Sequence, residues 1–332
     1  MHMPGKLKAI IAAGDRGKSH PVFGKNKAML DMDGLPIILR VISAVGKAES
    51  VSEIFVVGPK QRIEELLRPN PAYWTAGKPI HVFEQGSNLY ENIWNAFLET
   101  LPPERRQEAL ADAPPDGSGD EEVVLIMAGD MPLLTPTEVD EFVAQCDMEQ
   151  FDYVVGVTRE ESLRHYYPSK GQAGVRLAYM HFSDGNFRQN NMHMVRPLRL
   201  HNRHYVQTMY DLRYQKQFGN ILRLAWEILK REEGGWGAVG YYLLLQLSLL
   251  FARLRLGFLR DWVRKKTHAD SVARCISKLM KTRFGYAYTS LGGAALDVDK
   301  EHEYEAIKSR FREWMNYQHE RAGDVLRRID TH

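Results

Sequence analysis

The chain has 332 residues, of which 44% are hydrophobic and 26% are charged. This composition can bury a core and is not that of a disordered chain, and the length suits one large domain or two of ordinary size. Lysine plus arginine number 44 against 42 acidic residues, for a formal net charge of +2, which argues against a dedicated nucleic-acid coat protein. Two cysteines exclude a disulfide scaffold and a cysteine-rich zinc site. With no signal-peptide pattern, we expect a reducing, cytoplasmic location.

The first half of the chain alternates apolar runs with amphipathic segments. Strands are expected at residues 8–13, 54–57, 80–83, 123–127 and 153–157, and helices at 36–48, 63–67, 89–101 and 136–146. Continuous apolar strands that alternate with helices predict a mostly parallel sheet covered on both faces. We therefore expect an α/β, Rossmann-like fold with its ligands at the carboxyl ends of the strands.

Later segments depart from this alternation. Residues 102–122 are rich in proline and glycine and predict a surface loop. The spacing predicts a return to the sheet near residues 292–298 and a helical region over 301–328. We divide the chain into a core with an acceptor region (1–205), a mainly helical, basic insert (206–288), and a return to the core with a C-terminal helix (289–332).

The insert has three interpretations. It is a helical cap that packs on the sheet or builds a homodimer, a patch that lies on the inner face of a membrane, or a nucleic-acid-binding segment. Its longest apolar run, residues 239–251, is shorter than the roughly 20 residues of a membrane-spanning helix. Leucines beside concentrated positive charge suit an anionic lipid surface. Since no recognition motif appears, we expect no nucleic-acid partner.

A glycine-containing loop follows the first strand. Ala12, Ala13 and Gly14 end that strand, and Lys18 and Lys27 lie downstream. Backbone N–H groups of such a loop can approach phosphates closely, and the two lysines can neutralise their charge. The spacing is neither that of a Walker loop nor GxGxxG, so a simple turn remains an alternative.

Aspartates mark two further segments. Asp130 follows the apolar run 123–127, where it can hold Mg²⁺ or open a turn before Pro132. Asp297 and Asp299 alternate across Val298 and share a face in an extended chain. Each of these two is a candidate metal ligand or a cap for the following helix.

Together the three segments resemble, in order and spacing, the MobA-like and sugar-phosphate nucleotidyltransferases. The matching residues are 12–14, Lys27, 34–36, 129–132 and 297–299. The resemblance covers about residues 6–157 and 292–307 and leaves out the helical insert. Arg16 stands in the usual place of the second loop glycine, which falls one position late at Gly17, and Asn26 replaces the proline before the lysine.

The resemblance implies a Mg²⁺-dependent transfer of a nucleoside monophosphate from an NTP to a small phosphorylated acceptor, a sugar, polyol or alcohol phosphate, with release of pyrophosphate. It implies catalytic roles for Lys27, Lys18 and Asp130 and metal binding by Asp130 and Asp299, with Asp297 as an alternative ligand. The nucleotide is expected at Ala12, Ala13, Gly14, Arg16, Gly17, Lys18, Gln85, Ser87, Asn88 and Asn92. The acceptor site is expected beyond residue 157. Arginine can bind phosphate oxygens in pairs, and asparagine can bind hydroxyls. The candidates are Arg159, Arg176, Arg188, Asn190, Asn191 and Arg196.

Two alternatives accompany this hypothesis. If the insert lies on a membrane surface, a CTP-dependent enzyme that acts on a polyol or alcohol phosphate for lipid-headgroup synthesis would suit it. Within the same family, a molybdenum cofactor guanylyltransferase is the alternative. A different class is a degenerate nucleotide-binding module recruited to a membrane or a protein partner. Pyrophosphate release separates the two classes.

Overall fold

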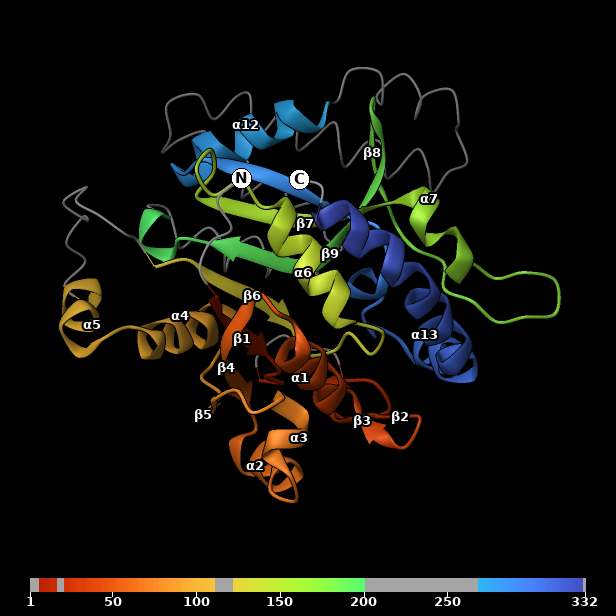
Figure 1. Cartoon of the computed structure of the whole chain (residues 1–332), viewed down its shortest axis with the longest axis horizontal. Coiled ribbons are helices and arrows are strands. Elements are labelled where there is room, and N and C mark those ends of the chain that lie inside the picture. The colour runs from red at the N-terminus through yellow and green to blue at the C-terminus, as the bar shows by residue number, and fades with distance from the viewer. Residues whose placement is uncertain (1–5, 17–20, 111–121, 201–267, 331–332) are drawn as a thin grey trace.

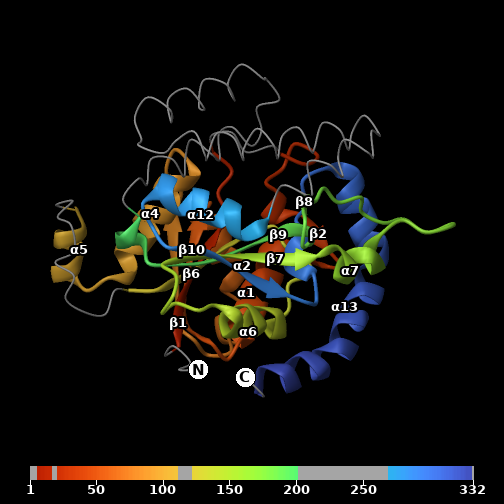
Figure 2. The same ribbon diagram turned by 90° about the horizontal axis from the view of Figure 1, so that it is seen from above.

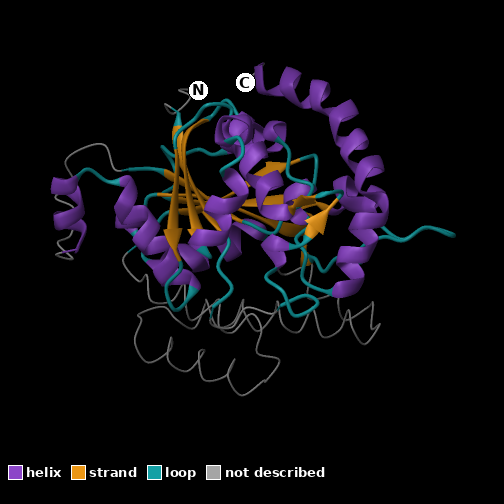
Figure 3. Ribbon diagram, turned by 90° about the horizontal axis from the view of Figure 1, so that it is seen from below, coloured by secondary structure: helices purple, strands orange, loops and turns teal. Residues whose placement is uncertain are grey.

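A computed structural model describes residues 6–16, 21–110, 122–200 and 268–330 of the chain. The predictions for Gly17, Lys18 and most of the helical insert lie outside these residues. Within the described part, an eight-stranded sheet has the order β10-β7-β9-β6-β1-β4-β5, and β8 pairs with β9. The sheet forms a single layer between helices (Figure 1, Figure 3).

Seven strands of this sheet run in one direction, and one runs against them. The parallel strands are β1 (Leu7–Ala12), β4 (Val51–Gly58), β5 (Ile80–Glu84), β6 (Val124–Ala128), β7 (Tyr153–Arg159) and β10 (Phe284–Thr289). β8 (Met180–Phe182) has the same direction but pairs antiparallel with β9 (Gly185–Val195), the strand that runs against the others and lies between β6 and β7. The carboxyl ends of the six parallel strands therefore meet at one edge of the sheet, where β9 begins.

Helices cover both faces of the sheet because the side chains of each strand alternate. Ala9 and Ile11 of β1 pack in the cluster that includes α1 (Ile37–Lys47), α6 (Pro136–Gln145) and α13 (Glu301–Asp330). Ile10 faces the other way, in the cluster that includes α4 (Leu89–Thr100). Figure 2 shows α4 and α12 (Ala269–Met280) on one side and α1 and α6 on the other.

Shorter elements complete the described chain. The helices are α2 (Lys60–Leu67), α3 (Pro71–Thr75), α5 (Pro103–Leu110) and α7 (Glu160–Leu163). The 3₁₀ turns are η1 (Lys27–Met29), η2 (Arg164–Tyr166), η3 (Pro197–Arg199) and η4 (Gly293–Ala295), and β2 (Asp31–Met32) pairs with β3 (Leu35–Pro36). None of the helices in the described part of the chain combines the length and hydrophobicity that a membrane span requires.

The predicted α/β, Rossmann-like sheet is confirmed, with local differences. Residues 103–110 form α5 rather than loop; a proline begins it, as suits the first helical turn, and Arg106 pairs with Glu99 of α4. The chain returns to the sheet at β10, residues 284–289, and not at 292–298, where the structure has the turn η4. The antiparallel pair β8 and β9 was not predicted.

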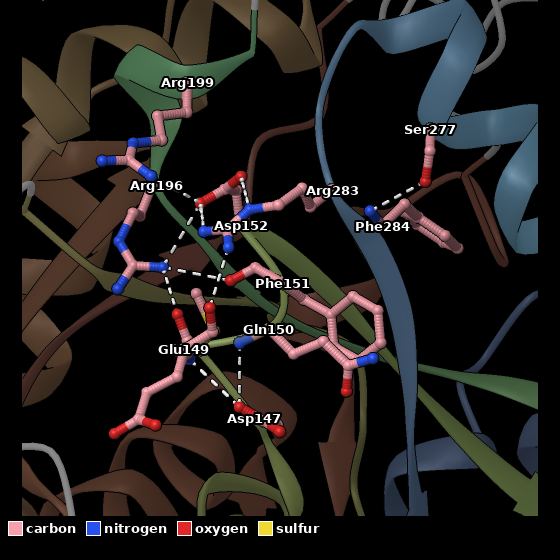
Figure 4. A network of polar contacts seen from close by, with 11 residues as sticks. Asp147, Glu149, Gln150, Phe151, Asp152, Arg196, Arg199, Ser277, Arg283 and Phe284 are labelled. Carbon is pink, nitrogen blue, oxygen red and sulfur yellow. Dashed lines mark hydrogen bonds and ion pairs between the residues drawn. The ribbon is translucent and has the colours of Figure 1, made fainter. Parts of the chain in front are cut away.

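A buried aspartate joins three strands at the amino-end edge of the sheet. Arg283 donates to Asp152 through Nε and Nη2, at 2.7 and 2.6 Å. Arg196 and Arg199 approach the same carboxylate, and Arg196 also donates to two backbone carbonyls. Figure 4 shows the three arginines converging on Asp152. Although burial alone would raise the pKa of Asp152, its hydrogen bonds and the arginine charges hold that pKa below the ordinary value. The cluster therefore fastens the adjoining ends of β7, β9 and β10.

Candidate active site

The loops after β1 and β6 touch at the carboxyl-end edge of the sheet. Gly129 donates its backbone N–H to the carbonyl of Ala12 at 2.8 Å. A Cβ at position 129 would lie 2.9 Å from the Cβ of Ala13, closer than such atoms normally come. The glycine is thus required by the close approach of two backbones, and this approach brings Asp130 next to the glycine loop.

Lys27 is held beside the same loop by its neighbour. Asn26 donates through Nδ2 to the carbonyl of Ala13 at 3.0 Å, and its Oδ1 accepts from the backbone N–H of Ala28 at 2.9 Å. Asn26 therefore caps η1 and fastens it to the glycine loop. The asparagine that departs from the family's proline supplies a direct link between Lys27 and the loop.

Three aspartates and Lys27 form one cluster. The Nζ atom of Lys27, which is buried, lies 2.6 Å from Oδ1 of Asp299 and 4.0 Å from Oδ2 of Asp130. Carboxylate oxygens of Asp130, Asp297 and Asp299 all lie within 4.8 Å of one another. The backbone N–H of Val298 donates to the carbonyl of Asp130 at 3.1 Å, which joins the late segment to the loop after β6. Segments more than a hundred residues apart thus meet at one point.

The surroundings of the Asp130 carboxylate disfavour its negative charge, which a bound cation could neutralise. Burial, and then the charge of Asp297, raise the pKa of Asp130 to about 7, against the opposing effect of Lys27. Its Oδ1 is buried and has no hydrogen-bond partner among the described residues. A buried oxygen without a partner is costly. Carboxylate oxygens are the donors that Mg²⁺ prefers, so the residues present fit the metal that the family implies.

Arg188 links the aspartate cluster to β9. Its Nη2 donates to Oδ1 of Asp297 at 2.8 Å, and its Nε donates to the carbonyl of Ala295 at 2.7 Å. Arg188 pairs with Thr158 near the carboxyl end of β7. Of the residues expected to bind the acceptor, Arg188 is therefore the one that the structure places in direct contact with the aspartate cluster.

Gln85 and Asn92 lie on the other side of the glycine loop. Gln85 accepts from the backbone N–H of Asp15 and donates to the Asp15 side chain, both at 2.7 Å. Its carbonyl accepts from Arg16 at 2.9 Å. A Cβ on Gly14 would lie 2.7 Å from Nδ2 of Asn92 and 2.9 Å from Oε1 of Gln85. The structure therefore brings these two predicted nucleotide-binding residues against the loop expected to bind the phosphates.

The neighbouring Ser87 and Asn88 have local roles at the start of α4. Asn88 caps the helix by accepting from the backbone N–H of Glu91 at 2.9 Å. The backbone N–H of Ser87 donates to the Glu91 side chain at 2.8 Å. Both contacts are those of a helix N-terminus.

Two of the residues expected to bind the acceptor, Asn190 and Arg196, lie away from the aspartate cluster. Asn190 is buried and donates to Thr289 at 2.9 Å, so its amide serves the interior of the sheet. Arg196 lies at the opposite edge, in the Asp152 cluster, because β9 runs against its neighbours and carries its last residues away from the site. Acceptor binding by these two residues therefore stays a prediction, and the contacts that the structure shows for them lie within the fold.

The remaining three differ in their surroundings. Arg159 ends β7 at the edge that holds the aspartates, and its guanidinium lies over the rings of Phe187 and Tyr288. Asn191 is half-buried and adopts a left-handed backbone, φ 57°, opposite the irregularity in the pairing of β7 and β9. Arg176 is exposed.

Sequence reasoning missed Glu138 and Glu141 of α6. Glu138 accepts from the backbone N–H groups of Gly292 and Ala294, and Glu141 accepts from the backbone and hydroxyl of Ser290. The one signal in the sequence is their spacing of three, which places both on one side of a helix. That spacing does not distinguish buried glutamates from solvated ones.

A parallel sheet with a glycine loop, a lysine and clustered carboxylates at its carboxyl edge defines a nucleotide-binding α/β protein. The model of the MobA-like NTP transferase domain matches residues 9–232, and the chain belongs to this family. Two proteins named 2-C-methyl-D-erythritol 4-phosphate cytidylyltransferase are similar to it. The one from Chlorobium luteolum is 27% identical over 136 residues, which are 41% of this chain and 52% of the relative. The one from Chloroherpeton thalassium is 33% identical over 134 residues, 40% of this chain and 51% of the relative.

The chain spans about half the length of these curated relatives. Among solved structures, a hypothetical transferase from Thermus thermophilus superposes with a TM-score of 0.54 at 18% identity, covering 90% of this chain and 99% of the other. That likeness supports the fold assignment.

Proposed function

We propose that the protein is a Mg²⁺-dependent nucleotidyltransferase that moves a nucleoside monophosphate from a nucleoside triphosphate to a small phosphorylated acceptor. The observation that carries the proposal is the meeting of Lys27, Asp130 and Asp299 beside the glycine loop. Bringing several negative phosphates together is the main obstacle to such a reaction, and clustered cations with metal-binding carboxylates address it.

The chemistry needs no general base from the protein. A phosphate monoester has a second pKa of about 6 and is largely dianionic at neutral pH. One of its oxygens forms a bond to the α-phosphorus, the bond from that phosphorus to the bridging oxygen breaks, and pyrophosphate leaves. Mg²⁺ held by Asp130 and Asp299, with Asp297 as a further ligand, would neutralise charge on the phosphates. The ammonium of Lys27, fixed by Asp299, adds a positive charge at the same place.

The positions of the remaining side chains support an arrangement of the two substrates. The triphosphate is proposed to lie along the backbone of Ala12, Ala13 and Gly14 with Arg16, and the base near Gln85 and Asn92 with Ser87 and Asn88. The acceptor phosphate is proposed to lie on the side of Arg188 and Arg159, because both side chains come from elements that end or begin at this edge of the sheet. Guanidinium groups can bind phosphate oxygens in pairs.

The names of the two curated relatives favour CTP as the nucleotide and a phosphorylated polyol-like compound as the acceptor. They give no support to the guanylyltransferase alternative. The membrane-surface and homodimer hypotheses concern the helical insert, most of which lies outside the described residues, and they remain predictions.

A substrate matrix tests the proposal. Four nucleoside triphosphates are combined with a panel of phosphorylated sugars, polyols and alcohols in the presence of Mg²⁺, and pyrophosphate is measured. We expect turnover that needs both substrates, is highest with CTP, and is lost in D130N.

The matched control is D147N, because Asp147 accepts only local backbone N–H groups of the turn that precedes β7. It should retain turnover. Nucleotide binding without pyrophosphate release under every condition would instead support the non-catalytic binding module.

A further inference from the structure

The segment that carries Asp297 and Asp299 is anchored by one buried carboxylate. This segment, residues 290–299, connects β10 to α13 and contains the turn η4. The Glu138 side chain accepts from the backbone N–H of Gly292 at 3.0 Å, from the backbone N–H of Ala294 at 2.9 Å, and from the hydroxyl of Thr289 at 3.2 Å. Glu138 is fully buried, with 0% of its surface exposed.

The backbone of the segment is shaped around this anchor. Gly292 has a φ of 90°, which favours glycine, and a Cβ at Gly293 would lie 2.1 Å from the carbonyl oxygen of Leu133. The segment therefore turns sharply against the loop after β6. A turn of this kind cannot give its N–H groups strand partners, so the carboxylate of Glu138 supplies the acceptors.

The anchored turn leads directly to the aspartate cluster. The carbonyl of Ala295 accepts from Arg188, which also binds Asp297. Three residues further on, the N–H of Val298 donates to the carbonyl of Asp130. The contacts of Glu138 thus fix one end of a short segment whose other end brings Asp297 and Asp299 to Asp130.

We propose that Glu138 is a positioning residue that holds Asp297 and Asp299 in the geometry needed to bind a divalent cation. Glu138 itself touches neither aspartate in any contact that the structure shows. The inference rests on the proposed function, because it takes the aspartate cluster to be a metal site.

The same helix offers a matched control. Asp140 also accepts two backbone N–H groups and one hydroxyl, at 2.6 to 3.0 Å, but its partners are Glu49 and Ser50 in the turn between α1 and β4. That turn lies at the amino end of β4, away from the aspartate cluster. A loss that is merely structural should affect E138Q and D140N alike, whereas a positioning role should affect only E138Q.

The test has two readouts. The first is hydrogen–deuterium exchange of the peptide covering residues 290–299, which shows how firmly Glu138 holds that segment. The second is the affinity for Mn²⁺, measured by electron paramagnetic resonance with and without CTP, which shows whether the metal site is intact. In E138Q an amide NH₂ group replaces one carboxylate oxygen, so one of the three donors loses its acceptor. We expect exchange in this peptide to accelerate at least about tenfold and Mn²⁺ to bind about tenfold more weakly, the low end of the loss seen when groups that support metal ligands are changed. D140N should change neither value more than about twofold.

Each result has a clear meaning. Equal Mn²⁺ binding by E138Q and D140N overturns the positioning role, even if the exchange of the peptide accelerates. Equal Mn²⁺ binding by the wild type and D130N contradicts the proposed metal site itself, and the exchange readout still tests whether Glu138 anchors the segment. If E138Q does not fold, as judged by circular dichroism, E138D keeps the charge, shortens the side chain by one methylene, and is subjected to the same two measurements.

Discussion

Replacing Asp130 by asparagine should stabilise the metal-free protein while abolishing turnover. The carboxyl group is buried beside Asp297, and its pKa is raised from 3.8 to about 7. A raised pKa means that the folded state binds this proton more tightly than the unfolded state does. The stability associated with the protonated group is therefore present below about pH 4 and is lost as the pH rises through about 7.

The size of the effect follows from the shift. Each pKa unit is worth about 1.4 kcal/mol, so a rise from 3.8 to about 7 means that ionising Asp130 costs the metal-free fold roughly 4 kcal/mol at pH 8. Asparagine carries no charge at any pH and removes this cost. Lys27 lies 2.6 Å from Asp299 and 4.0 Å from Asp130, so we expect the variant to keep the closer of these two ion pairs.

Urea unfolding in EDTA at pH 8 and pH 5 measures this difference. We expect D130N to be more stable than the wild type at pH 8 by a few kcal/mol and much less so at pH 5, and we expect Mg²⁺ to stabilise only the wild type. A D130N protein that is less stable than the wild type at pH 8 without metal would refute the reasoning, because it would show that the ionised carboxylate is well satisfied without a cation.

Three further predictions concern single residues. Lys27→Met should lower kcat, measured by pyrophosphate release, at least about a hundredfold, which is the usual loss when one preorganised group that stabilises a transition state is removed. An unchanged kcat would contradict a role of Lys27 in catalysis. Asp152→Asn should destabilise the fold by about 2 kcal/mol, because the variant weakens charged hydrogen bonds to partly exposed arginines. Urea unfolding measures this loss, and the KM for nucleotide should stay unchanged. Gly14→Ala should weaken nucleotide binding, measured by calorimetry, because its Cβ meets Asn92 and Gln85; unaltered affinity would show that this loop does not contact the nucleotide.

The central parallel strands could be predicted because they are buried on both faces and therefore read as continuous hydrophobic runs. β6 and β7 are of this kind. β9 lies between them and was missed, since its sequence includes Arg188, Gln189, Asn190 and Asn191. These polar side chains are accommodated by tertiary partners such as Thr289 and Asp297, which no local pattern reveals.

Some residues of the candidate site could likewise be predicted from local sequence patterns, and others could not. Asp130 and the glycine loop follow apolar strands, and the rule that strand ends carry ligands finds them. Lys27, Asp297 and Asp299 were found through the order of motifs in a resembling family, since their contact spans 272 residues of chain. The role of Glu138 could not be predicted, because its spacing from Glu141 does not distinguish a buried glutamate and its partners lie more than 150 residues away.

The proposed active site requires a divalent cation that three distant segments hold beside a nucleotide. Crystals grown with Mn²⁺ and CTP, and measured at a wavelength where manganese scatters anomalously, test this directly. We predict an anomalous peak bounded by Asp130 and Asp299, next to the phosphates and within reach of Lys27. A triphosphate and its metal bound elsewhere, with the aspartates paired only to Lys27 and Arg188, would contradict the proposed active site.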